Sequence, residues 1–394
     1  MTNTMDTSFS SADHRWMALA VSRARRGLGR VWPRPAVGCV LVGDDSAGGR
    51  RLIAAGHTGE GAHRHTPAGE GGRPHAEAVA LDRAGPAARG ATAYVTLEPC
   101  AHAGDPPKTP CAERLIAAGV SRVVSAMADP DSRVAGRGHK ALRAAGITVD
   151  SGLLGEAAAA LNAGFLQRLT SGRPFVTLKL ASSLDGRIAT AGGESRWITG
   201  PQSRAHAHGL RLSHDAVLVG IGTALSDDPA LTCRLPGIAA DDRLAQPVRI
   251  VVDPRLDLPP TARLLSSAAG AVWLLADEAA DGARRRRLED LGARILALPS
   301  GADGLAPSAM LQALGAAGLT RVLVEGGAGV AGRLLAAGLV DQLVWYRAPL
   351  LVGGDGVAAV GHLNLARLAD ARRFRRLSLD HLGADVVETL QPVS

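Results

Sequence analysis

Three side chains that are far apart in the sequence but suited to one metal ion constrain the fold most: His75, Cys100 and Cys111. Imidazole nitrogen and thiolate sulfur bind zinc, and a catalytic zinc keeps three protein ligands so that water can take the fourth position. A strand-like segment, 92–97, leads into Cys100, and helical patterns begin at His75 and at Cys111. The sequence therefore predicts two helix N-termini that converge on a metal, where the positive ends of the helix dipoles favour thiolate.

A carboxylate, Glu77, follows the first of these candidate ligands by two residues. His-x-Glu followed by Pro-Cys-x-x-Cys is the signature of zinc deaminases, in which the Glu is the general acid/base and not a ligand. Pro99 precedes Cys100 as the signature requires, but ten residues, 101–110, separate the two cysteines where the signature has two. We interpret the group as a hydrolytic deaminase site with three zinc ligands and Glu77 as the acid/base catalyst.

Other histidines are alternative ligands in principle. His57, His63 and His65 lie in a Gly/Pro/His-rich stretch, 56–74, and His102 lies beside Cys100. Solvated loop histidines are the simpler interpretation of all four. A purely structural role for the predicted ligand group is the alternative to zinc binding.

Length and composition limit the number of domains and the class of protein. A chain of 394 residues is long enough for two or three domains, and 46% hydrophobic with 21% charged residues is typical of a soluble globular protein. No apolar run approaches the roughly 18 residues that span a membrane, and the N-terminal charges are in the wrong order for a secretory signal, so a cytoplasmic location is expected. Four cysteines are too few for a disulfide framework, and Cys39 and Cys233 are expected to be buried or partly buried thiols.

The net charge of +7 is carried almost wholly by arginine, because Lys108, Lys140 and Lys179 are the only lysines. That skew is compositional and indicates no particular partner. The run Arg284–Arg287 has no interleaved aromatic residues for base stacking, so we expect a solvated surface helix and no nucleic-acid partner.

Strands and helices alternate in both halves, which predicts an α/β fold. In the first half we expect helices over 14–27, from 75, from 111 and over 136–145, and strands over 36–42, 91–97 and 122–127. In the second half we expect strands over 175–180, 215–219, 248–252, 271–276, 321–325 and 341–346, with surface loops over 236–246 and 299–307. The expected domains are 1–154 and 173–394, joined by a connecting helix within the linker 155–172.

Several motifs resemble those of the bifunctional riboflavin-biosynthesis deaminase/reductase family. Besides the zinc motif they are Ala36–Val40, Tyr94–Cys100, Asp129-Pro130, Val134–Gly138, Lys179–Ala189, Gly193–Thr199, Asp227–Thr232 and Val324–Gly327. The motifs run in the family's order over nearly the whole chain. The resemblance implies an N-terminal cytidine-deaminase-like α/β/α sandwich and a C-terminal dihydrofolate-reductase-like α/β domain.

The family's activity converts diaminohydroxyphosphoribosylaminopyrimidine into 5-amino-6-(5-phosphoribitylamino)uracil. The resemblance therefore implies one zinc ion for deamination and NADPH for reduction of the ribosyl to the ribityl side chain, since side chains cannot supply a hydride. The expected partner is this phosphoribosyl-pyrimidine, with no nucleic acid and no membrane, and a homo-oligomer is expected.

The resemblance also implies contact residues in the second half. NADPH contacts fall on Ala181, Trp197, Thr223, Asp227, Gly327, Ala328, Gly329, Val330, Ala331, Gly332 and Arg333. Substrate contacts fall on Ser195, Arg211, Leu231, Arg234 and Glu325, and the two arginines suit a sugar phosphate because guanidinium binds phosphate oxygens in a bidentate fork. The loop 325–329 lacks G-x-G-x-x-G, so a Rossmann unit is not predicted.

Three departures from the family pattern leave alternatives open. Arg34-Pro35 stands where the family has Asn-Pro, and the loop before His75 and the segment between the cysteines are longer than usual. One alternative is a reductase whose deaminase half binds zinc but is inactive or altered in specificity; another is a nucleic-acid base deaminase. Asp185, Asp227 and Glu325 are candidates for polar chemistry in reduction, with a structural role as the alternative for each.

Overall fold

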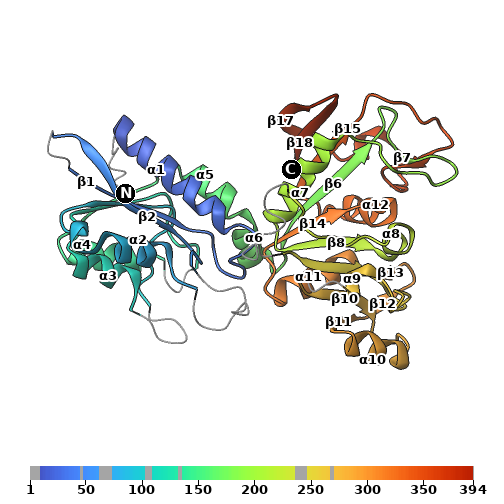
Figure 1. The fold of residues 1–394 in the computed structure, drawn as a ribbon, viewed down its shortest axis with the longest axis horizontal. Helices are drawn as coiled ribbons and strands as arrows, with labels where there is room; N and C mark the ends of the chain where they lie inside the picture. The colour runs from blue at the N-terminus through green and yellow to red at the C-terminus, as the bar shows by residue number, and fades with distance from the viewer. Residues whose placement is uncertain are drawn as a thin grey trace. The chain divides into compact units, whose positions relative to one another are not determined.

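The computed structural model describes residues 9–44, 48–61, 73–102, 109–131, 135–235, 246–266 and 270–393. The chain divides into two compact units, Met1–Thr170 and Ser171–Ser394, each built around its own sheet (Figure 1). Among the described residues, no helix has the length and apolarity needed to cross a membrane.

The first unit is a five-stranded sheet in the order β2-β1-β3-β4-β5. Its elements are α1 (Ser11–Ala24), η1 (Arg25–Gly27), β1 (Gly38–Asp44), β2 (Arg50–His57), α2 (Ala76–Ala84), η2 (Gly85–Ala88), β3 (Thr92–Val95), α3 (Cys111–Ala118), β4 (Arg122–Ser125), α4 (Arg137–Ala144), β5 (Thr148–Ser151), α5 (Gly155–Leu161) and α6 (Ala163–Ser171). Strand β1 runs antiparallel to β2 and β3, whereas β3, β4 and β5 are parallel. Helices α1 and α5 cover one face and α2, α3 and α4 the other, which makes an α/β/α sandwich (Figure 1).

Alternate residues of β1 pack into the two cores of this sandwich, because successive side chains of a strand point to opposite faces of the sheet. Val40 packs in the core under α1, and Leu41 packs in the core under α2 and α3. The backbone of α1 touches the strand directly, since a Cβ on Gly38 would lie 2.0 Å from the carbonyl oxygen of Ala20. The glycine of the Val-Gly-Cys motif is therefore required by helix–strand packing.

The N-terminus of α1 carries a buried polar network that fastens the helix to the sheet. Ser10 and Asp13 form a capping box, and the Asp13 carboxylate accepts hydrogen bonds from Tyr94 Oη and Arg122 Nη1, both 2.7 Å long. Burial by itself raises the pKa of Asp13, but the hydrogen bonds from Tyr94, Arg122 and Ser10 outweigh it and hold this pKa well below the ordinary 3.8.

This network predicts an acid-sensitive first unit. Because the folded-state pKa of Asp13 is depressed, its stabilisation is fully present above pH 3.8 and is lost as the pH falls further towards the folded-state value. We expect Asp13→Asn to lower the urea midpoint at pH 7, and we expect the gap from wild type to narrow at pH 3, as followed by circular dichroism. An equal gap at both pH values would contradict the assignment.

Three features of the first unit depart from the prediction, and one of them is the unpredicted strand β5 at the edge of β4. Residues 50–57 are not predicted as a strand, yet they form β2 along the edge of β1. Its Ala54-Ala55-Gly56 run has low strand propensity, but it admits α2, since a Cβ on Gly56 would lie 2.6 Å from the carbonyl oxygen of Ala76. The single helix expected over 155–170 is two helices, because the Asn162 side chain is bonded to both backbone polar groups of Ala36, at 2.8 and 3.0 Å.

The second unit is a nine-stranded sheet in the order β11-β10-β9-β8-β14-β6-β15-β18-β17. Its elements are β6 (Phe175–Ser182), β7 (Arg187–Ala189), α7 (Pro201–Leu212), β8 (Ala216–Gly220), α8 (Ile221–Asp227), β9 (Val248–Val252), α9 (Arg263–Ser266), β10 (Val272–Asp277), α10 (Gly282–Asp290), β11 (Ala293–Leu298), β12 (Ser300–Gly301), β13 (Gly304–Leu305), α11 (Pro307–Ala316), β14 (Arg321–Glu325), α12 (Ala328–Ala336), β15 (Gln342–Arg347), β16 (Val357–Ala358), η3 (Leu368–Asp370), β17 (Phe374–Leu382) and β18 (Asp385–Pro392). Neighbouring strands from β11 to β15 are parallel, and β15, β18 and β17 are antiparallel.

The predicted strands of the second half are all present, with ends that differ by at most two residues. The run Arg284–Arg287 lies in the surface helix α10 as predicted. The loop expected over 299–307 is wrong in part, because β12 and β13 form a small hairpin there, and 236–245 of the other expected loop lies outside the described residues. The antiparallel pair β17 and β18 is not predicted, since its pairing with β15 is long-range.

Candidate functional site

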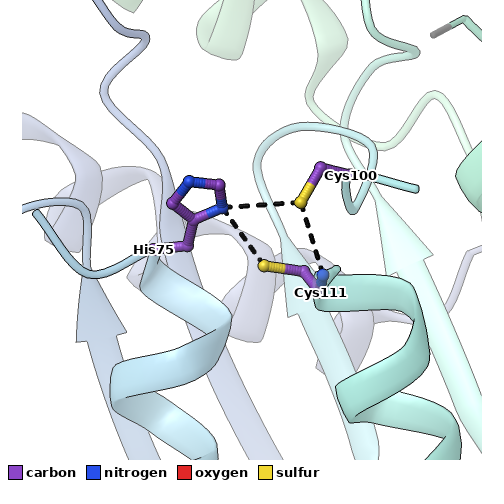
Figure 2. A group of neighbouring side chains, drawn as sticks. All are labelled: His75, Cys100 and Cys111. Atoms are coloured by element: carbon purple, nitrogen blue, oxygen red, sulfur yellow. Dashed lines mark hydrogen bonds between the residues drawn. The ribbon is translucent and has the colours of Figure 1, made fainter. Parts of the chain in front are cut away.

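The predicted metal ligands meet at one point of the first unit. Figure 2 shows His75 at the start of α2, Cys111 at the start of α3 and Cys100 on the segment between β3 and α3. His75 Nδ1 lies 3.2 Å from Cys111 Sγ and 3.5 Å from Cys100 Sγ, and the three ligand atoms lie within 4.8 Å of one another. One imidazole and two sulfurs at this separation are a donor set that fits zinc.

The charge state of the Cys100 sulfur suits a metal, whereas the hydrogen bond to Cys100 and burial raise the pKa of Cys111. The pKa of Cys100 is lowered to about 4, chiefly because it accepts a hydrogen bond from the Cys111 side chain, with His75 and the backbone N–H of Cys111 adding to the effect. Burial opposes this shift. Thiolate is the form of cysteine that binds metals, so Cys100 is ready to act as a ligand.

Glu77 lies in the first turn of α2 and is only 4% exposed. Burial raises its pKa to about 6, although the neighbouring His75 partly opposes that shift. A carboxylate with a pKa near neutrality exchanges protons at physiological pH, as a general acid/base must. Cys39, predicted to be a buried or partly buried thiol, is fully buried; burial raises its pKa, and the nearby Glu77 carboxylate raises it further.

The chain just before His75 is anchored by a turn after β2. His57, expected to be a solvated loop histidine, instead ends β2 with Nδ1 2.8 Å from Glu60 Oε2, so that expectation is wrong. Glu60 also pairs with Arg83 of α2 at 2.9 Å. The turn donates the backbone N–H of Gly59 to the carbonyl of Pro74, the residue before His75. His102 is exposed, and His63 and His65 lie outside the described residues.

A second cluster of charged side chains lies in the second unit, at the carboxyl ends of adjacent parallel strands. Glu325 ends β14, and Arg211 of α7 binds its carboxylate in a bidentate pair of 2.6 and 2.8 Å. Although burial opposes it, Arg211 lowers the pKa of Glu325 to about 2. The carboxyl edge of a parallel sheet is where α/β proteins bind ligands.

Lys179 belongs to this cluster, and sequence reasoning missed it as a site residue. It is the register partner of Glu325 on β6, and its Nζ lies 5.7 Å from the ring centroid of Tyr346 on β15. The hydroxyl of Tyr346 is in turn 2.6 Å from Nδ1 of His206 on α7. A lysine within a predicted apolar strand, in a chain with only three lysines, is the sequence signal that marks it.

The predicted cofactor residues Thr223 and Gly327 lie side by side between the ends of β8 and β14. A Cβ on Gly327, whose φ is +81°, would lie 3.3 Å from Thr223 Oγ1, and Gly326 has a φ of +87°. Helix α12 begins directly afterwards, and no side chain caps it. Backbone N–H groups at such a helix start are donors for a phosphate group.

The remaining residues predicted to contact NADPH or substrate differ in their exposure and in their hydrogen-bond partners. Trp197 is 68% exposed under the guanidinium of Arg204, Ala331 and Gly332 are buried in the packing of α12, and Arg333 is bonded to the carbonyl of Leu305. Ala181 packs beneath α7, Leu231 is buried, and the carbonyl of Asp227 accepts a hydrogen bond from Arg196. Ser195 is half-buried, and Ala328, Gly329 and Val330 form the first turn of α12.

The two arginines expected to bind the sugar phosphate differ in the exposure and the hydrogen-bond partners of their guanidinium groups. Arg211 is 13% exposed and is committed to Glu325 and to the carbonyl of Thr232. Arg234 is exposed and donates one hydrogen bond to Thr232 Oγ1. Asp185 is a structural carboxylate, because it accepts the backbone N–H groups of Val352 and Gly353.

Comparison with known proteins gives a match for each half of the chain. Residues 10–127 match the cytidine and deoxycytidylate deaminase zinc-binding region, and residues 174–387 match the RibD C-terminal domain. The riboflavin biosynthesis protein RibD of Escherichia coli is 42% identical, over 95% of this chain and 98% of its own length, and that of Bacillus amyloliquefaciens is 39% identical, over 96% and 95%.

Solved structures give the same result over nearly the whole chain. RibD of Acinetobacter baumannii superposes with a TM-score of 0.83 at 39% identity, covering 97% of this chain and 99% of that one. A diaminohydroxyphosphoribosylaminopyrimidine deaminase/5-amino-6-(5-phosphoribosylamino)uracil reductase of Thermotoga maritima superposes with a TM-score of 0.80 at 32% identity, with the same coverage.

Fold and sites thus define an enzyme in which a zinc-binding deaminase region precedes a reductase domain. The chain belongs to the RibD family, the bifunctional deaminase/reductases of riboflavin biosynthesis. The predicted α/β fold class, with its cytidine-deaminase-like first half and its reductase second half, and the predicted enzyme class are confirmed.

Proposed function

We propose that this chain carries out two consecutive steps on one phosphoribosyl-pyrimidine. The first is zinc-dependent hydrolytic deamination of diaminohydroxyphosphoribosylaminopyrimidine within residues 1–154. The second is NADPH-dependent reduction of the ribosyl to the ribityl side chain within 173–394, with 155–172 as the linker. The observation that carries the proposal is the meeting of His75, Cys100 and Cys111 beside buried Glu77, in a chain that also carries the reductase domain.

In the deaminase site, His75, Cys100 and Cys111 would hold the zinc, which supplies Lewis acidity that lowers the pKa of water. Glu77 takes one proton from the attacking water and gives it to a ring nitrogen; it then takes the proton of the newly added hydroxyl group and gives it to the departing ammonia. Its raised pKa of about 6 suits both roles near neutral pH. Burial of the carboxylate keeps bulk water from competing for the proton.

In the reductase site, the first turn of α12 with Gly327 and Thr223 would hold the phosphates of NADPH, which supplies the hydride. Hydride addition to C1′ of the ribosyl group breaks the C1′–O4′ bond, and Lys179 is placed to give a proton to O4′, because its ammonium lies at the same strand edge as Glu325. Arg211 holds Glu325 in its ionised form, and exposed Arg234 is left to bind the sugar phosphate.

Substitution of Gly327 tests the cofactor assignment. Gly327→Val puts a branched side chain on a residue with a φ of +81°, against Thr223, and so closes the proposed cradle. We expect KM for NADPH to rise at least tenfold, with ammonia release from the diamino substrate unchanged. Gly292→Val, also at positive φ but in the turn between α10 and β11 with open space around it, is the matched control. Equal KM values in the two variants would contradict the assignment.

A coupled assay tests the function as a whole. Zinc-loaded protein given the diamino substrate and NADPH should release ammonia and oxidise NADPH in sequence. NADPH oxidation on the deaminated substrate alone, without ammonia from the diamino one, would show a reductase whose first half is inactive, as the Arg34 departure allows. Neither signal would refute the proposal. The expected homo-oligomer is tested by light scattering, and the expected cytoplasmic location by cell fractionation.

A further inference from the structure

Cys100 is the candidate ligand with the least local support. His75 and Cys111 are each fixed by the first turn of a helix, but residues 98–100 lie in neither helix nor strand. A ligand on irregular backbone needs another source of rigidity if the three donor atoms are to keep one geometry. That source lies two residues earlier, at Glu98.

The Glu98 carboxylate is buried and saturated with backbone donors. Its side chain is 1% exposed. Oε2 accepts the N–H groups of Asp129 at 3.1 Å and Gly136 at 2.9 Å, and Oε1 accepts those of Gly138 at 2.9 Å and His139 at 3.2 Å. Two of these donors are backbone N–H groups in the first turn of α4, and the N-cap residue of this helix offers them no side-chain acceptor. Glu98 supplies the missing acceptor, although it precedes the helix by about 40 residues in the chain.

The backbone of residues 98–100 is also held by close contacts with its neighbours. The N–H of Glu98 donates to the carbonyl of Met127 at 2.9 Å. A Cβ on Gly138 would lie 1.9 Å from the carbonyl oxygen of Pro99, so only glycine lets α4 reach this backbone. The carbonyl of Cys100 then accepts the N–H of Ala112 in α3 at 3.0 Å. Residues 98–100 are thus clamped between α4 on one side and α3 on the other.

We propose that Glu98 is a positioning residue of the metal site, whose carboxylate holds Cys100 in ligand geometry by binding the backbone N–H groups of Asp129 and of residues 136, 138 and 139. The inference rests on the proposed zinc site. It assigns a task to a carboxylate that neither contacts the metal nor moves a proton. Residues that orient metal ligands typically contribute about 10- to 100-fold to metal affinity.

Glu98→Gln tests this proposal in the full-length chain. The amide keeps the shape of the side chain but turns one acceptor into a donor that faces backbone N–H groups. We expect the zinc dissociation constant, measured by competition with a chromophoric chelator, to rise about 10- to 100-fold. In the cobalt-substituted protein, the thiolate-to-cobalt charge-transfer band should weaken, because Cys100 is the ligand released.

Asp253→Asn is the matched control. Asp253 is a fully buried carboxylate of the second unit that accepts the backbone N–H groups of Asp257 and Leu258, each at 2.9 Å. Its loss should lower thermal stability in the same way without changing zinc affinity. If Glu98→Gln lowers stability but binds zinc as tightly as wild type, with the cobalt band intact, Glu98 is only structural and the proposal is wrong.

A conservative variant covers the case in which Glu98→Gln does not fold. Glu98→Asp keeps the charge with a side chain one methylene shorter, and we expect zinc affinity between those of wild type and Glu98→Gln. Wild-type affinity in Glu98→Asp, with α4 opened in hydrogen exchange, would overturn the proposal. If wild type itself binds no zinc, the proposed deaminase chemistry fails, and this proposal with it; a loss in the variants alone leaves that chemistry standing.

Discussion

Glu77→Gln is expected to lower kcat for deamination about 10²- to 10⁴-fold, the range associated with loss of a positioned general acid/base. The amide fits the same buried space in the first turn of α2 but accepts no proton. Zinc content should stay at one ion per chain, because Glu77 is not among the three clustered ligand atoms. Ammonia release and metal analysis on the same preparation measure both quantities.

The reductase half supplies an internal control for this experiment. NADPH oxidation on the deaminated substrate should be unchanged in Glu77→Gln, since the residue belongs to the other compact unit. Cys111→Ala gives the contrasting pattern, in which zinc and deamination are lost together. Full zinc stoichiometry in Cys111→Ala would refute the ligand assignment, and near-normal ammonia release in Glu77→Gln would refute its catalytic role.

Arg211→Ala is expected to destabilise the second unit by about 3–5 kcal/mol, the usual effect of removing one partner of a buried ion pair. Glu325 would be left ionised and buried with its bidentate partner gone. Reduction should also be lost, because Glu325 sits at the strand edge that the substrate must reach. Urea unfolding combined with hydrogen exchange of peptides from α7 and β14 reports on this unit separately from the first.

A double variant separates the structural effect of this pair from its catalytic effect. Arg211→Met with Glu325→Gln removes both charges, so most of the lost stability should return, because no charge is left buried without a partner. Reductase activity should stay absent. If Arg211→Ala is as stable as wild type, the Glu325–Arg211 pair does not hold this edge of the sheet.

Sequence patterns predicted the elements whose signal is local. Strands such as 248–252 and 321–325 are recovered with their observed ends, because each is a short, continuous apolar run of a parallel sheet. Strand β2 was missed for the opposite reason. Its small residues are poor strand formers, and only its pairing with β1 and its contact with α2 make it a strand.

The candidate sites divide in the same way. The sequence predicted the candidate zinc ligands and Glu77, because zinc chemistry restricts them to few residue types at recognisable spacings, and the order of motifs predicted the family. The structure adds three contacts that no sequence pattern predicted: Arg211 binds Glu325, 114 residues away, Lys179 lies beside Glu325, and Glu98 accepts backbone N–H groups of α4. Those contacts join residues distant in the chain, and no local pattern encodes which partner a buried charge will meet.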